Sequence, residues 1–143
     1  WPGTVDAGVS EALISQVDLY ASLAAMLGVE IADGEAVDSL NVVDALLGRS
    51  ETARDYIIEE SVVTLSLRKG NWKYIAPTSP QGNERAQWVA IDKAIEGGFT
   101  AQAQLYNLAE DPTEQNNIAN DHPELVQEMS QKLAELRISG FRN

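Results

Sequence analysis

Residues 62–76 read VVTLSLRKGNWKYIA, and this stretch decides the fold that the sequence predicts. Its first half alternates apolar and polar residues, which is the period-two pattern of a half-buried β-strand. Gly70-Asn71 supplies a turn, because both residue types tolerate a positive φ. The segment after the turn places Trp72 and Tyr74 on one face. We therefore predict a β-hairpin with one apolar face.

A single hairpin is only marginally stable in water, so another element must cover its apolar face. The best candidate is a long helix predicted at residues 123–139, where a capping box of Asp121 and Glu124 precedes an amphipathic pattern. The apolar stripe of this helix comprises Leu125, Met129, Leu133 and Leu136. Further short strands are predicted at residues 56–58 and 105–108. The expected fold class is α+β, a small antiparallel sheet of about four strands covered by the long C-terminal helix.

The N-terminal third of the chain predicts helices without strands. Asp18 suits the N-cap of a first helix that ends at Gly28. A second, short helix is predicted after Ser39. The apolar positions of the first helix, which recur at helical spacing, are Leu19, Leu23, Met26 and Leu27.

The composition excludes several function classes. The chain has 143 residues and a formal net charge of −12, whereas nucleic acids and anionic membrane surfaces bind basic faces. No apolar run is long enough to span a membrane. With no cysteine, the chain has neither a disulfide, nor a thiolate metal site, nor a cysteine nucleophile.

Residues 77–103 form a long polar excursion between predicted strands, and excursions of this length in compact domains are often functional. Arg85, Trp88 and Lys93 lie within it. Cationic and aromatic side chains on a loop suit contact with a sulfated sugar. A solvated loop anchored by Trp88 is the competing interpretation, and the sequence favours it.

Other polar and aromatic residues have structural interpretations that outweigh functional ones. His122 has no partner that would make it a base or a metal ligand. Asp111 and Glu114 lack the spacing of a calcium loop and fit a turn better. Trp72 and Tyr74 could stack on sugar rings, but aromatic residues on a covered strand are more often part of the core.

Four stretches together resemble segments of one known family, in that family's order. They are WPG at residues 1–3, QVDLY at 16–20, LRKGNWKYI at 67–75 and LYNLAEDPTEQNN at 105–117. The chain resembles the C-terminal portion of a type I sulfatase of the arylsulfatase group. The resemblance implies that residues 1–50 are the end of an alkaline-phosphatase-like α/β catalytic domain. Residues 51–143 would then be the C-terminal subdomain, with the rest of the catalytic domain as its partner.

The resemblance also implies which groups the chain does not carry. Enzymes of this family use a formylglycine, made from the first residue of a Cys/Ser-x-Pro/Ala-x-Arg motif, and a Ca²⁺ held by clustered Asp and Asn. The chain has no cysteine, and no serine lies in that motif. We therefore expect no catalytic, cofactor-binding or metal-binding residue in this chain. Formylglycine and Ca²⁺ are expected in the full-length parent enzyme.

The implied function is that of a structural and substrate-shaping subdomain. The parent would hydrolyse the sulfuric ester of a sulfated small molecule or carbohydrate, and the chain by itself would be inactive. The alternative is a free-standing, non-catalytic binding or interaction module.

Two further expectations concern the chain's surroundings. Trp1-Pro2-Gly3 is an unusual beginning, so we expect the chain to start inside a longer protein, exported or periplasmic by family resemblance. The apolar stripe of the first helix would then lack its natural partner. Such a stripe could repack onto the C-terminal subdomain, become disordered, or pair with another copy of the chain, and we expect pairing.

Overall fold

The computed structural model describes residues 1–61, 64–78 and 100–139, which divide into two compact units. The first unit runs to Ile57, and the second spans Ile58–Ile138. Within the described ranges, no helix is both long and apolar enough to cross a membrane.

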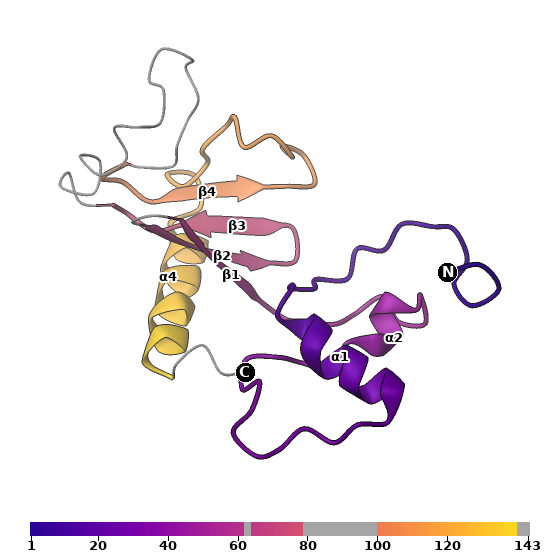
Figure 1. Ribbon diagram of the computed structural model, residues 1–143. Helices are drawn as coiled ribbons and strands as arrows, with labels where there is room; N and C mark the ends of the chain where they lie inside the picture. Colours follow the sequence, from indigo (N-terminus) through magenta and orange to yellow (C-terminus); the bar gives the residue numbers. More distant parts are fainter. Residues whose placement is uncertain (62–63, 79–99, 140–143) are drawn as a thin grey trace, which may run out of the picture. The chain divides into compact units, whose positions relative to one another are not determined.

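The second unit is built on a four-stranded antiparallel sheet with the order β1-β2-β3-β4 (Figure 1). The strands are β1 (Ile57–Ser61), β2 (Thr64–Lys69), β3 (Trp72–Ile75) and β4 (Gln104–Asn107). The predicted hairpin is confirmed, because Lys69 of β2 lies opposite Trp72 of β3. Gly70 in the connecting turn has a φ of 55°, a conformation that glycine adopts without steric cost.

One row of side chains across the sheet forms the centre of its core. The strand register places Leu67 opposite Tyr74, and Tyr74 opposite Leu105. Their exposed fractions are 0%, 3% and 0% respectively. Burial of this row from three strands is the hydrophobic contribution that holds the sheet together.

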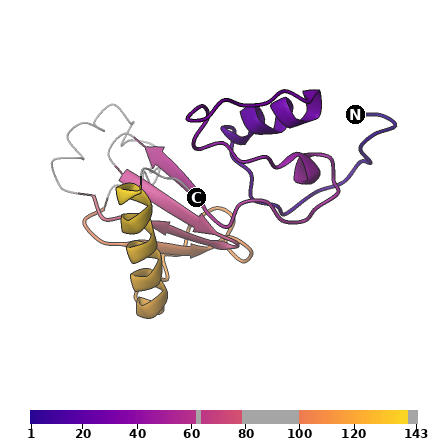
Figure 2. The same ribbon diagram turned by 90° about the horizontal axis from the view of Figure 1, so that it is seen from below.

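The long helix α4 (Pro123–Ile138) packs against β2 and β3. Figures 1 and 2 show it lying across one face of the sheet. Lys69 identifies this face, because its Nζ lies 2.6 Å from Glu128 Oε1 of α4 and its side chain points to the same side as Leu67. The predicted stripe is buried at Met129, Leu133 and Leu136. The α+β fold predicted from the sequence is therefore confirmed.

The first unit contains α1 (Asp18–Leu27) and the single turn α2 (Val43–Leu46). The end of α1 is as predicted, with Gly28 in the left-handed conformation at a φ of 66°. The apolar stripe predicted for α1 is exposed, with Leu23 51% and Leu27 77% accessible. Its buried residues are instead Asp18, Ala21 and Ser22.

Asp18 does not cap α1, which corrects the prediction from sequence. It is the first helical residue, and the N-cap position belongs to Val17. Its carboxylate accepts hydrogen bonds from the backbone N–H groups of Ser15 and Leu40, at 2.8 and 2.9 Å. The Arg54 guanidinium donates two more, at 2.7 and 2.5 Å. The sequence could not reveal this role, because Arg54 lies 36 residues away.

Ser39, which the sequence offers as the start of the second helix, also binds a group distant in sequence. Its Oγ accepts a hydrogen bond from the Ala21 N–H of α1, rather than capping α2. Ser22 Oγ accepts one from the Val42 N–H, at 3.0 Å. The contact between α1 and the chain before α2 is therefore made largely by polar side chains that satisfy buried backbone groups.

Opposing effects determine the pKa of Asp18. Burial acts to raise it, since it disfavours the charged carboxylate. The hydrogen bonds from Arg54, Leu40 and Ser15, together with the charge of Arg54, outweigh burial, so the pKa lies below its ordinary value. The carboxylate therefore stabilises the folded chain above the unfolded-state pKa, and this stabilisation is lost as the pH falls through the folded-state pKa.

We predict that Leu133→Ala lowers the free energy of unfolding of the second unit by about 2–5 kcal/mol, the usual cost of a cavity at a buried leucine. Chemical denaturation measures this change. Gln131→Ala is the matched control on the exposed face of α4, with an expected change within about 0.5 kcal/mol. A loss below about 1 kcal/mol for Leu133→Ala would show that α4 is not docked through this residue.

We also predict that Asp18→Asn destabilises the first unit by about 3–5 kcal/mol at neutral pH, because it leaves Arg54 charged and unpaired. The difference in unfolding free energy from the unmodified chain should narrow as the pH falls below the ordinary carboxyl pKa of about 4 and through the lower folded-state pKa of Asp18. Unfolding followed across this pH range measures it. Asp44→Asn is the control, because the Asp44 carboxylate is exposed and its Oδ1 lies 3.9 Å from Nη1 of the likewise exposed Arg49. A difference in unfolding free energy between the two chains that stays constant down to the lowest pH at which they fold would contradict this role of Asp18.

Candidate functional site

The face of the sheet opposite α4 carries a cluster of ionic side chains. Lys73 of β3 lies centrally, with its Nζ 2.8 Å from Glu114 Oε1 and 3.6 Å from Glu59 Oε2. Ser66 Oγ donates a hydrogen bond to Glu59 at 3.3 Å. The Lys73 side chain is only 19% exposed, so the two carboxylates compensate a largely desolvated cation.

Glu114 lies in the turn that follows β4, and its φ is 56°. This left-handed conformation is uncommon for a residue with a side chain. Asp111 organises the same turn, because its Oδ2 accepts a hydrogen bond from the Asn116 N–H at 2.8 Å. Backbone N–H groups of Asn116 and Gln115 hold the pKa of Asp111 below its usual value. The turn chemistry predicted for this segment matches these contacts.

Asn117 continues this segment along the outer edge of β4. Its Oδ1 accepts a hydrogen bond from the Leu105 N–H at 3.1 Å, and the Ile118 N–H donates to the Leu105 carbonyl at 3.0 Å. Both backbone groups of the fully buried Leu105 are thereby satisfied at a strand edge. An asparagine side chain takes the place of a neighbouring strand there.

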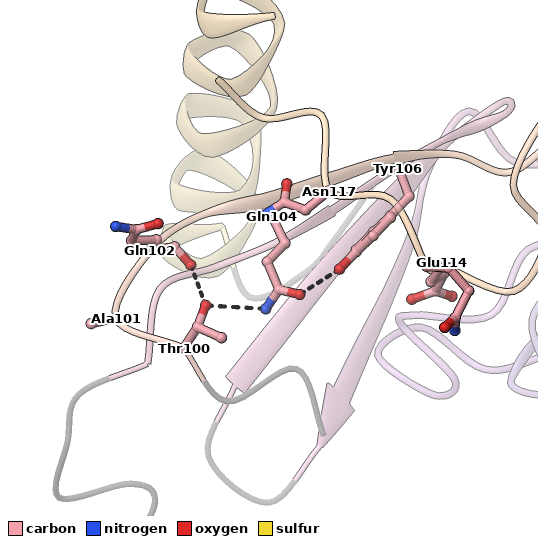
Figure 3. Close-up of a pocket in the computed structure, with 8 residues that line it drawn as sticks. Thr100, Ala101, Gln102, Gln104, Tyr106, Glu114 and Asn117 are labelled. Atoms are coloured by element: carbon pink, nitrogen blue, oxygen red, sulfur yellow. Dashed lines mark hydrogen bonds between the residues drawn. The ribbon is translucent and has the colours of Figure 1, made fainter. Parts of the chain in front are cut away.

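A pocket of about 560 Å³ opens beside β4, between these residues and the chain that enters the strand (Figure 3). Its lining residues are Thr100, Ala101, Gln102, Gln104, Tyr106, Glu114, Gln115 and Asn117. Gln104 and Tyr106 are on β4 and point away from α4, because Leu105 between them points into the core. The volume lies in the range of small-ligand sites.

A chain of hydrogen bonds fixes one wall of the pocket. Tyr106 Oη donates to Gln104 Oε1 at 2.6 Å, and Gln104 Nε2 donates to Thr100 Oγ1 at 3.3 Å. Thr100 Oγ1 donates in turn to the Gln102 carbonyl at 2.7 Å (Figure 3). This wall presents amide and hydroxyl groups in fixed orientations, which suits hydrogen bonding to a polar ligand.

The described residues of the pocket include no nucleophile paired with a base, and their side chains suit binding rather than covalent chemistry. Across the described residues, no three His, Cys, Asp or Glu side chains gather as a metal site would require. His122 lies against Trp72 with ring centroids 5.6 Å apart, next to the start of α4. Tyr74 is in the core, as predicted.

The predicted substrate-contact residues Arg85, Trp88 and Lys93 lie outside the described residues. The pocket on β4 was not predicted from the sequence. Alternation along residues 104–106 could have indicated that Gln104 and Tyr106 share a face, but not that Glu114 and Asn117 meet them there.

Curated proteins that are similar to the chain include several sulfatases. The chain is 39% identical over 138 residues to an N-acetylgalactosamine-6-O-sulfatase of Bacteroides thetaiotaomicron, covering 96% of this chain and 26% of that protein. It is 28% identical over 148 residues to bovine arylsulfatase A, covering 96% of this chain and 28% of the relative. The chain thus spans about a quarter of the length of these relatives. No model of a protein family matches.

A solved structure agrees with these relatives. It comes from work on how Bacteroides thetaiotaomicron metabolises multiple glycosaminoglycans, and its sequence identity to this chain is 38%. The TM-score is 0.79, with 96% of this chain and 28% of the solved chain covered. The likeness therefore extends over both units of the chain.

We predict that Asn117→Ala destabilises the second unit by about 1–3 kcal/mol, because the buried Leu105 N–H loses its acceptor. Asn117→Asp keeps an acceptor oxygen and should recover most of that stability. Asn116→Ala is the matched control at an exposed neighbour, with an expected change within about 0.5 kcal/mol. Equal effects of Asn117→Ala and Asn116→Ala in chemical denaturation would show that the Asn117 side chain does not hold the edge of β4.

Proposed function

The chain belongs to the sulfatase family and corresponds to the C-terminal part of such an enzyme, and we propose that the whole enzyme hydrolyses sulfuric esters of carbohydrates. The single observation that carries this proposal is the alignment of almost the entire chain with an N-acetylgalactosamine-6-O-sulfatase. By analogy with that relative, a 6-O-sulfated N-acetylhexosamine is the first substrate to test.

Within that enzyme, the second unit serves as a structural and substrate-shaping subdomain. The chain carries no cysteine and no serine in the formylglycine motif. Glu59 and Glu114 pair with Lys73, Asp111 holds a turn, and the described residues include no group of three His, Cys, Asp or Glu side chains that could hold a metal ion. Formylglycine would supply the nucleophile and Ca²⁺ the charge that binds the sulfate group, both on residues outside this chain.

Residues 1–50 represent the end of the catalytic domain in this proposal, and residues 51–143 the C-terminal subdomain. The exposed apolar side chains of α1, such as Leu23 and Leu27, support this assignment, because surface of this kind usually meets a partner. The partner is the remainder of the catalytic domain. Pairing of isolated copies through the same side chains remains a prediction, which sedimentation of the chain beside its Leu23→Glu variant tests.

We predict that the purified 143-residue chain releases no sulfate from an aryl sulfate, whereas the longer protein that contains it does. The physical reason is that the nucleophile and the metal site lie outside this chain. Sulfate release, measured with an aryl sulfate and with 6-O-sulfated N-acetylgalactosamine, checks both statements.

Two results would count against this account in different ways. Turnover by the pure, homogeneous chain would contradict its role as a non-catalytic part. A longer protein that hydrolyses aryl sulfate but no sulfated sugar would contradict the carbohydrate substrate, and one that hydrolyses neither would overturn the proposed activity.

A further inference from the structure

We propose that the pocket on β4 binds an uncharged sugar unit of the carbohydrate substrate, an inference that rests on the proposed function. The pocket of about 560 Å³ lies within a single unit of the structure, and described residues line it. Its volume is sufficient for a monosaccharide, given that small-ligand pockets range from about 300 to 1,000 Å³.

The chemistry of the lining fits sugar hydroxyl groups. Most of the lining side chains are amides or hydroxyls, each of which can donate or accept a hydrogen bond. The hydrogen-bonded wall from Tyr106 through Gln104 to Thr100 holds these groups in place before a ligand arrives. Such preorganisation lowers the entropic cost of binding a flexible, polar ligand.

The charge of the pocket selects against the sulfate group. Among the described residues that line it there is no lysine or arginine, and the carboxylate of Glu114 faces the same space. Lys73, whose partner Glu114 lines the pocket, is already compensated by Glu59 and Glu114. An anionic group in the pocket would therefore meet a carboxylate, with no lysine or arginine among the described lining residues to compensate it, in a chain whose net charge is −12.

Two exposed glutamines at the pocket offer groups that the fold does not use. The described structure gives the Gln102 side chain no hydrogen-bond partner, and Gln115 uses only its Nε2, which donates to the Thr113 carbonyl at 2.8 Å. Glu114, which also lines the pocket, has a left-handed backbone conformation and pairs with Lys73. Backbone conformations of this kind are frequent where a side chain is presented to a ligand.

Titration of the 143-residue chain with N-acetylgalactosamine and with its 6-O-sulfated form, followed by NMR of side-chain amides, tests the pocket directly. We expect shifts at Gln104 and Asn117, and binding of the unsulfated sugar at least as tight as that of the sulfated one. The double variant Gln102→Ala/Gln115→Ala should weaken binding about tenfold, the effect of losing two hydrogen bonds of ordinary strength. Gln131→Ala, which removes an exposed amide on α4, should leave binding unchanged.

The proposal is overturned if neither sugar shifts the pocket signals, if the sulfated sugar binds more tightly, or if the double variant binds like the control. In the longer protein, the double variant should raise KM for the sulfated sugar while kcat and KM for a sugar-free aryl sulfate stay unchanged. Hydrolysis of sulfated sugars that is unaffected by the variant overturns the pocket and leaves the proposed function intact. If the longer protein hydrolyses no sulfated sugar, the proposed function is overturned. The NMR titration of the 143-residue chain still tests whether the pocket binds a sugar.

Discussion

The second unit depends on the pairing of β3 with β4, because this pairing completes the row of Leu67, Tyr74 and Leu105 beneath α4. The three residues come from segments far apart in the chain, and each is almost fully excluded from water. Side chains alternate along a strand, so a shift of one residue in register would expose this row and bury its polar neighbours. The same register therefore determines which groups reach the opposite face, where Lys73 and the pocket lie.

Two of the stretches that resemble the sulfatases, residues 67–75 and 105–117, are also joined physically. Lys73, in the first, pairs with Glu114, in the second, across 41 residues of sequence. Asn117, at the end of the second stretch, satisfies the backbone of Leu105 at the sheet edge. These residues thus form a connected framework around β3 and β4, which gives the family resemblance a structural explanation within this chain.

Patterns local in sequence predicted the elements well. The alternation before Gly70 and the stripe through Leu133 correctly indicated a hairpin, a covering helix and the face on which they meet. Contacts between distant polar residues were not predictable, because composition does not reveal which charges meet. Asp18 shows this limit most clearly, since it suits a helix cap by position but is buried in a pair with Arg54. Periodicity on α1 also predicted which residues share a face, but not that this face is exposed here.

The central claim is that α4 and the sheet form one cooperative structure around the row of Leu67, Tyr74 and Leu105. Native-state hydrogen exchange tests it most directly, because it measures the opening free energy of each amide. The account predicts that amides of α4 near Met129 and Leu133 exchange with the same free energy as those of Tyr74 and Leu105. Exchange of the α4 amides at a clearly lower free energy than those of the strands would contradict it, since the helix would then open without the sheet.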